Sequence, residues 1–235
     1  MTGTEAGGTG GRAAMSSMVR LLQLASPALP IGGYSYSTGL ESAIEFRQVV
    51  DAATAFDWIN DALSLVIGRF DAPLLAAAWH ACKEEDGQAL ARLNGLALAA
   101  RETAEFRLES EQMGYSLVQW IIQVPDPGEL PLPAELPVAA TIAWAMAAWK
   151  LELDARAAVT GYLWSFAENQ VMVLIKTLPL GQIQAQRVLH RLGPHIDEVA
   201  ATALSLPPPQ WSNAAPGLAI ASMRHETQYS RLFRS

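Results

Sequence analysis

The sequence has little that would suggest disulfide cross-links, secretion or membrane insertion. Cys82 is the only cysteine among 235 residues, so no disulfide can form within one chain, and a reducing compartment fits this composition. No uninterrupted apolar run reaches the ~20 residues that a membrane-spanning helix needs. The glycine-rich first residues lack the apolar core of a signal peptide. We therefore expect a cytoplasmic protein that does not enter a membrane.

Charged residues are also scarce. They make up 17% of the chain, and acidic residues outnumber basic ones to give a net charge of −7, which argues against general nucleic-acid binding. Hydrophobic residues make up 51%, and many are alanines, whose small side chains let helices pack closely. A surface so poor in charge suggests that part of it is covered by partners. We accordingly expect a homodimer that also binds other proteins.

Motifs for catalysis or metal binding are largely missing. The pair Gly32-Gly33 lacks the lysine and hydroxyl residue of a Walker-type phosphate loop, and no short motif pairs carboxylates for acid–base chemistry. The four histidines share no zinc-ligand spacing. His80 and Cys82 lie two positions apart, a spacing that points them in different directions on a helix. The residues therefore predict a protein that is not an enzyme and that carries no metal or cofactor.

Apolar periodicity and capping residues predict an all-α fold of about eight to ten helices. Thr38 to Glu41 has the spacing of a capping box, Asp51 or Thr54 can cap a further helix, and Asp71 with Pro73 in its first turn should open another. The run 171–175 is too short for its period to distinguish strand from helix, but its surroundings favour helix. The expected helices span about 19–25, 38–46, 51 or 54 to 67, 71–82, 88–103, 103–124, 138–151, 154–178 and 180–206.

Proline-rich breaks suggest the domain organisation. Residues 1–17 are expected to be a flexible leader, 18–206 one all-helical domain, 207–219 a proline-rich linker and 220–235 a docking tail. The proline-rich segment 125–137 could divide two domains. We favour a connection within one domain, because each half alone would have too small a core.

The last sixteen residues, IASMRHETQYSRLFRS, combine side chains that are typical of binding surfaces. Arginine and tyrosine are the residue types most enriched in interface hot spots, so we expect this tail to bind another protein. A disordered tail, or a final helix that returns to its own core, is the alternative. The candidate contact residues within the tail are Arg224, His225, Gln228, Tyr229, Arg231, Leu232 and Phe233.

This tail closely resembles the C-terminus of the UreF family, the helical chaperones of nickel-urease maturation. A second block, LLQLASPALPIGGYSYSTGLESAIE (21–45), resembles that family's N-terminal signature. A third, GYLWSFAENQVMVLIKTLPLGQ (161–182), lies where the family has its long late helix. The three blocks occur in the family's order, and the resemblance implies the all-α fold as well.

The resemblance also implies a function. Proteins similar to this one dimerise and bind the accessory protein UreD (also called UreH), and the complex recruits the GTPase UreG and docks on apo-urease. The chain is therefore expected to be a non-enzymatic adaptor in nickel insertion. The alternative is a GTPase-activating protein that inserts Arg224, Arg231 or Gln170 into the partner's active site.

Positions that match the family's blocks add further candidates for contact or relay roles. These are Tyr34, Tyr36, Glu41 and Lys176, and by resemblance alone Lys176 would gate GTP hydrolysis or its coupling to activation. Arg224 would order the tail. Simpler readings stay open, because the tyrosines could be core-facing rings of a tight turn and Glu41 a carboxylate favoured by the helix dipole.

A polar cluster, Glu168-Asn169-Gln170, interrupts an otherwise apolar helix. Such side chains inside a helical domain are expected to form hydrogen bonds or ion pairs with a neighbouring helix.

Overall fold

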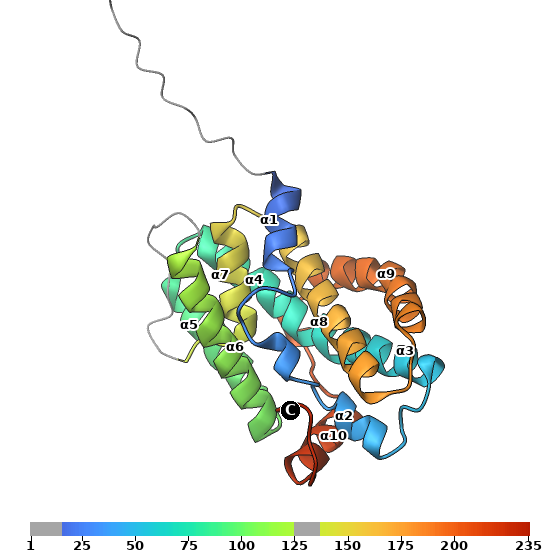
Figure 1. Cartoon of the computed structure of the whole chain (residues 1–235). Helices are drawn as coiled ribbons and strands as arrows, with labels where there is room; N and C mark the ends of the chain where they lie inside the picture. The colour runs from blue at the N-terminus through green and yellow to red at the C-terminus, as the bar shows by residue number, and fades with distance from the viewer. Residues whose placement is uncertain (1–15, 125–136) are drawn as a thin grey trace, which may run out of the picture.

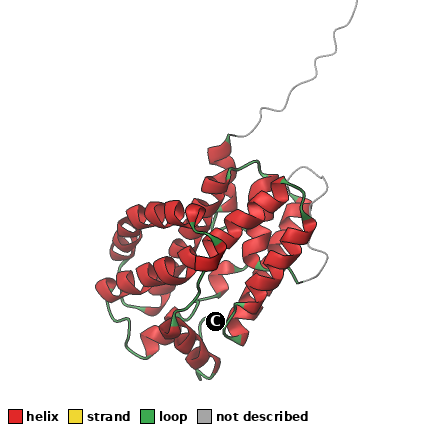
Figure 2. Cartoon of the chain, turned by 180° about the vertical axis from the view of Figure 1, so that it is seen from behind, coloured by secondary structure: helices red, strands yellow, loops and turns green. Residues whose placement is uncertain are grey.

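The structure of this chain, a computed structural model, describes residues 16–124 and 137–235. Within these two ranges every regular element is helical and no strand occurs, which confirms the predicted all-α class (Figure 2). The predicted leader, apart from residues 16 and 17, and the proline-rich segment up to 136 lie outside the described residues.

The helices follow the predicted order closely. The run 171–175 lies inside one of them, so the choice of helix over strand is confirmed. Short 3-10 turns occur at Gly33–Ser35 and Pro208–Gln210. The helices are α1 Ser17–Leu24, α2 Leu40–Glu45, α3 Ala52–Asp61, the π-helical segment Ala62–Asp71, α4 Ala72–Lys83, α5 Gly87–Ala99, α6 Ala104–Gln123, α7 Ala140–Lys150, α8 Ala155–Thr177, α9 Gln182–Ser205 and α10 Pro216–Glu226.

Side-chain caps define several helix starts. Asp51, one of the two predicted caps, accepts hydrogen bonds from the N–H groups of Ala53 and Thr54, and Thr54 completes a capping box that was not predicted. Three more starts are capped by a side-chain oxygen that accepts from a first-turn N–H. These caps are Asp86 on α5, Thr103 on α6 and Asp154 on α8.

The core of the bundle is built around α4 and α7. Helix α4 packs against α5, α7, α8 and α9, and α6 packs against α7. Figure 1 shows α5 and α6 on one side of these central helices and α8 and α9 on the other. Along α7 the residues from 141 to 148 are all buried, as expected for a helix that is surrounded by neighbours on every side.

Helix α4 begins at Ala72 with Pro73 in its first turn, as predicted, but the Asp71 side chain does not cap it. The chain is helical without a break from 52 to 83, with a π-helical stretch before α4. Pro73 has no N–H to offer the carbonyl of Arg69, and the backbone N–H of Ser212 donates to that carbonyl instead, at 3.1 Å. A distant segment thus satisfies the group that the proline leaves free.

The start of α2 also differs from the prediction. Its N-cap is Gly39, with φ of +80°, and Thr38 itself has φ of +51°. With the backbone in this conformation, the Thr38 hydroxyl donates to Glu109 on α6 at 3.2 Å and forms no capping box with Glu41. Glu41 is left free for the contacts described below.

The continuous helix from 52 to 83 is long and apolar enough to cross a membrane. In its most apolar window, however, 72% of the residues are buried inside the bundle. This is the pattern of a helix at the centre of a domain.

Gly114 permits the closest approach between α6 and the start of α7. A Cβ atom at this position would lie 1.9 Å from the carbonyl oxygen of Val138, which is backbone and cannot rotate away. We expect Gly114→Ala to lower the free energy of unfolding by at least about 2 kcal/mol, because the two segments must separate. Urea unfolding measures this change.

The matched control is Gly95→Ala in α5, where no atom of the described residues lies within 4 Å of the added carbon. This change should raise the free energy of unfolding by about 0.5–1 kcal/mol, because alanine favours a helix more than glycine does. Equal stability of the two variants would contradict the proposed close contact at Gly114.

Candidate functional site

The end of the chain folds back over the bundle and lies against the first loop and the N-terminal half of α6. Figure 1 shows α10 beside α2, with the C-terminus close to both. Arg234 N–H donates to the carbonyl of Ser35 at 2.8 Å, and Ser37 N–H donates to the carbonyl of Ser235 at 2.7 Å. In this structure the segment therefore contacts its own core, which was the alternative to a free docking tail.

The predicted linker and tail are divided differently by the helices. Helix α10 begins at Pro216, within the range expected to be a linker, and ends at Glu226 inside the expected tail. Its Ser222 hydroxyl lies 2.7 Å from that of Thr103. Glu226 accepts hydrogen bonds from the N–H groups of Ala104 and Glu105, so a residue of the tail caps the start of α6.

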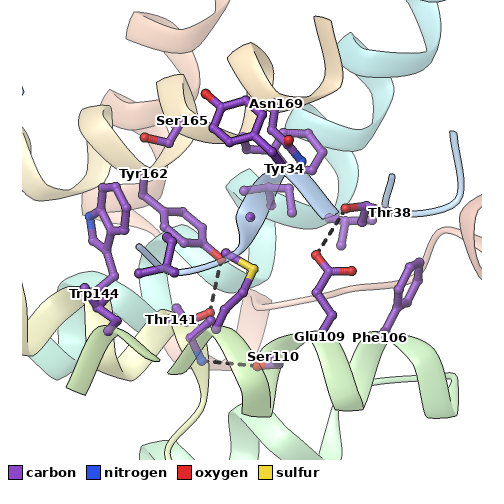
Figure 3. A pocket seen from close by; sticks show the side chains of 18 of the residues that line it. Tyr34, Thr38, Phe106, Glu109, Ser110, Thr141, Trp144, Tyr162, Ser165 and Asn169 are labelled. Carbon is purple, nitrogen blue, oxygen red and sulfur yellow. Dashed lines mark hydrogen bonds between the residues drawn. The ribbon is translucent and has the colours of Figure 1, made fainter. Parts of the chain in front are cut away.

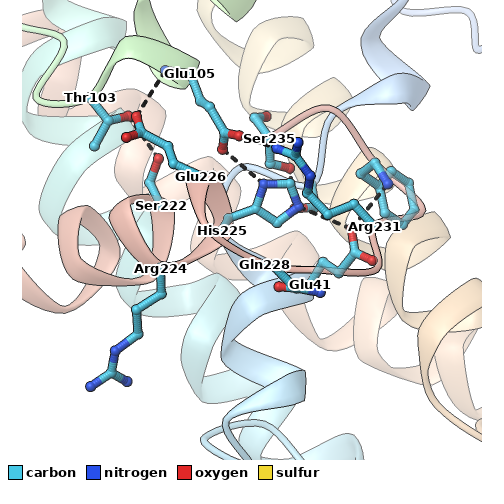
Figure 4. A network of polar contacts seen from close by, with 12 residues as sticks. Glu41, Thr103, Glu105, Ser222, Arg224, His225, Glu226, Gln228, Arg231 and Ser235 are labelled. Atoms are coloured by element: carbon cyan, nitrogen blue, oxygen red, sulfur yellow. Dashed lines mark hydrogen bonds and ion pairs between the residues drawn. The ribbon is translucent and has the colours of Figure 1, made fainter.

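Glu41 is the main anchor of the residues after α10 (Figure 4). Its side chain is 6% exposed, and its two oxygens accept from the N–H of Leu232 at 2.7 Å and of Phe233 at 3.0 Å. A third contact joins it to Nε2 of His225 at 3.1 Å. A buried carboxylate needs such donors, and here all of them come from the tail.

His225 is fully buried between two carboxylates. Its Nδ1 lies 2.8 Å from Glu105, while Nε2 faces Glu41. Only an imidazolium carries an N–H on both nitrogens, so this is the form that satisfies both contacts. Arg231 adds a second cation, 2.9 Å from Glu105. We call these four residues, Glu41, Glu105, His225 and Arg231, the tail anchor.

Glu109 holds the last residue of the chain. It accepts from the Ser235 hydroxyl at 2.6 Å and from the Thr38 hydroxyl at 3.2 Å. Burial raises the pKa of its carboxyl group, while the Ser235 hydrogen bond and the charge of Arg101 act in the opposite direction. The group therefore links the loop before α2, α6 and the C-terminus.

Two further candidates gather around the tail. Phe233 is buried, and the Lys176 ammonium lies 5.2 Å from the centre of its ring. Tyr36 is also buried; its hydroxyl donates to Gln112, and burial raises its pKa. Tyr36 and Phe233 both line a 390 Å³ hollow between the tail and α6.

The polar cluster of α8 contacts the first loop, where a neighbouring helix was expected. Asn169 donates to the carbonyl of Tyr36 at 3.0 Å, and Gln170 donates to that of Ser37 at 3.1 Å. Because Ser37 also binds Ser235, α8 and the C-terminus fix the same turn of the chain from two sides.

Tyr34 lies apart from the tail anchor, although only one residue separates it from Tyr36. It is partly buried and lines a cavity inside the bundle. Burial and the charge of Glu168 raise its pKa to about 12, so its hydroxyl keeps its proton at neutral pH. The structure thus separates the two tyrosines that the sequence placed together.

Three of the remaining candidates face outward, and Gln228 is partly buried. The side chains of Tyr229 and Leu232 are fully exposed and 72% exposed, respectively. Arg224 is exposed and lies 4.7 Å above the ring of Phe46, so the ordering of the tail that we expected from Arg224 comes from Glu41. The amide of Gln228 donates to the carbonyl of Ser230 within the tail.

Several residues of the site carry no signal in the sequence. Glu105 and Glu109 lie on α6, more than a hundred positions before the tail residues that they bind, and nothing in their spacing indicates that pairing. Thr103 was placed only at a helix boundary, although it also binds Ser222. These pairings can be identified only from the tertiary structure.

In the two described ranges, no group of three or more histidine, cysteine or acidic residues is arranged to hold a metal ion. The tail anchor is thus an arrangement of ion pairs and hydrogen bonds between protein groups. It can fix a segment, and it presents no nucleophile with an adjacent base.

Comparison with known proteins agrees with these features. A model of the UreF family matches residues 49–193, which is more than half of the chain. The chain belongs to the UreF family. It is 48% identical to the urease accessory protein UreF of Azoarcus sp. (strain BH72), over 93% of this chain and 95% of that protein. It is also 48% identical to UreF of Pseudomonas aeruginosa (strain LESB58), over 94% of this chain and 100% of that protein.

The role of Glu41 predicts a large local effect of its removal. Glu41→Ala leaves His225 and two backbone N–H groups without their acceptor, and we expect it to cost about 3 kcal/mol. Amide exchange in residues 227–235 should become about 100-fold faster. Glu111→Gln, which breaks only the exposed pair with Arg107, is the control and should cost less than about 0.5 kcal/mol. Unchanged exchange in Glu41→Ala would contradict the anchoring role.

Glu109 predicts a pH dependence of stability. Because its folded pKa is raised above the unfolded value, the protonated carboxyl stabilises the fold at low pH, and that contribution is lost as the pH rises through the folded pKa. The stability of the natural chain relative to Glu109→Gln should therefore fall as the pH rises above the ordinary pKa of 4.5 and through the raised folded pKa. Urea unfolding of both proteins measures this difference. A difference that grows with pH would contradict the raised pKa.

Proposed function

We propose that this protein is a non-enzymatic adaptor in urease maturation that binds a UreD-type (UreH-type) accessory protein through the exposed face of its C-terminal tail. One observation carries the proposal. The tail's backbone is fixed by buried carboxylates, while Tyr229 and Leu232 project from it into solvent. An exposed aromatic ring beside an exposed leucine on a fixed segment is a favourable anchor for a partner. The names of the relatives support the pathway.

A tail that is held before the partner arrives has an energetic advantage. Ordering a free segment upon binding would reduce the affinity, since the lost conformational entropy opposes association. Here the hydrogen bonds from Leu232 and Phe233 to Glu41 already fix the backbone. The partner then needs to order only side chains such as those of Tyr229 and Arg224.

The resemblance to the UreF family supports a proposal for the wider assembly. In this proposal a cytoplasmic homodimer of the chain binds the UreD-type protein, and the complex recruits the UreG-type GTPase and docks on apo-urease. Lys176, exposed beside Phe233, lies close enough to the tail to take part in the same surface.

The alternative function, a GTPase-activating protein, receives less support from the geometry. Gln170 is buried and donates to the carbonyl of Ser37, and Arg231 pairs with Glu105, so neither is available to a partner's active site without loss of these contacts. Arg224 is exposed, and it lies over Phe46.

Replacing the two exposed tail residues tests the proposal. Tyr229→Ala combined with Leu232→Ala should weaken binding to the cognate UreD-type protein by about 30-fold or more, the effect of losing a hot spot of at least about 2 kcal/mol. Surface plasmon resonance measures the affinity. The stability of the chain should hardly change, because neither side chain is buried.

Leu22→Ala is the matched control. Leu22 is 63% exposed on α1, at the opposite end of the bundle from the C-terminus (Figure 1). Its replacement should leave the affinity unchanged. If the tail variant bound as tightly as the natural chain, the interface would lie elsewhere on the bundle and the proposal would fail.

A further inference from the structure

A cavity of 140 Å³ lies inside the bundle, between the segment 24–38 and the helices α6, α7 and α8 (Figure 3). Much of its wall is apolar, with rings and thioether from three helices. The main apolar groups are Leu117, Met113, Phe106, Trp144 and Phe166. The volume is close to the ~150 Å³ of an engineered apolar cavity that holds one benzene molecule.

One part of the wall is a buried polar network. Asp71, at the end of the π-helical segment, is 1% exposed and forms a two-pronged ion pair with Arg101. The Thr141 hydroxyl donates to Asp71 at 3.1 Å and lies 3.3 Å from the hydroxyl of Tyr162 (Figure 3). The ion pair neutralises both charges, so this part of the wall is polar without a net charge.

Three polar atoms on residues of the cavity wall have no hydrogen-bond partner within the described ranges. They are Nε of Arg101, Oγ of Ser165 and Oδ1 of Asn169, and each is shielded from solvent. The other end of the Asn169 amide donates to Tyr36, which identifies Oδ1 as the free acceptor. Buried polar groups are paired in nearly all proteins, so three such atoms around one cavity point to a polar ligand.

The charges around the cavity restrict the class of ligand. Glu102 and Glu109 also line it, and an anion would face both of them. Burial raises the pKa of Glu102 and of Glu109, which shows that the surroundings already disfavour negative charge. A neutral molecule is not repelled by these carboxylates and places no negative charge in these surroundings.

We propose that this cavity binds a small neutral molecule with an apolar, ring-sized body and a hydroxyl or amide group that bonds to Ser165 and Asn169. Ser165 and Asn169 lie four positions apart on α8, so both face the same side of the helix. In Figure 3 they lie on either side of the Tyr34 ring.

The cavity shares residues with the segment that ends the chain. Asn213 and Leu218 form part of its wall, and Glu109 carries the hydroxyl of Ser235. A bound molecule would therefore stabilise the packing of α10 against the bundle. The inference does not depend on the adaptor function, because it rests on the cavity alone.

Phenol is the probe that tests the inference, with toluene as a molecule of the same size without a hydroxyl and benzoate as the anion. Titrations of the full chain followed by saturation-transfer NMR measure each dissociation constant. We expect saturable binding in the order phenol, then toluene, with none for benzoate. Ser165→Ala should weaken phenol binding by about five-fold and leave toluene unchanged, since one hydrogen bond is lost.

Ser165→Leu fills the cavity and should abolish binding of both probes. Should that variant fail to fold by circular dichroism, Ala140→Leu fills the space from α7 instead. Absence of saturable phenol binding would show that the cavity accepts only water and would overturn the inference. Phenol binding that survives both Ser165→Ala and a filled cavity would place the molecule elsewhere and would overturn it equally.

Discussion

The carboxylate of Glu41 connects α2, in the N-terminal part of the chain, to the C-terminal tail. It is buried at the start of α2, where an unpaired negative charge would be strongly unfavourable, and its donors lie almost two hundred residues away in the tail. His225 also contacts Glu105, and Glu105 in turn binds Arg231. Contacts of this one cluster hold α2, α6 and the tail together, because its carboxylates take their donors from His225, Arg231 and the backbone of the tail.

A second polar cluster has a similar role at the centre of the bundle. Asp71 lies at the point where the π-helical segment gives way to α4, and Arg101 and Thr141 reach it from other parts of the chain. The chain tolerates Pro73 here because Ser212 donates to the carbonyl of Arg69 that the proline leaves without its helical donor. The segment after α9 thereby packs against the core helices. It also forms part of the wall of the cavity near Asp71.

Glu109 connects the cavity wall with the end of the chain. One of its oxygens accepts from Thr38, in the loop that also lines the cavity, and the other accepts from Ser235. The last residue of the tail and the cavity thus share contact with a single side chain. Any partner that moves the last residues must change the contacts of Glu109, which provides a physical route between the tail and the interior.

The sequence by itself determined the helices and the family. Local side-chain caps at Asp51, Thr103 and Asp154 act within one turn, so their effect can be read from neighbouring residues. The composition of the tail also indicated a candidate binding segment. Only the tertiary structure decided that Glu41 binds this tail and that Tyr34 and Tyr36 belong to different sites. It also decided that the Thr38 hydroxyl donates to Glu109 and does not cap α2. Each of these outcomes depends on a buried group finding a partner far along the chain, and such pairings leave no periodicity in the sequence.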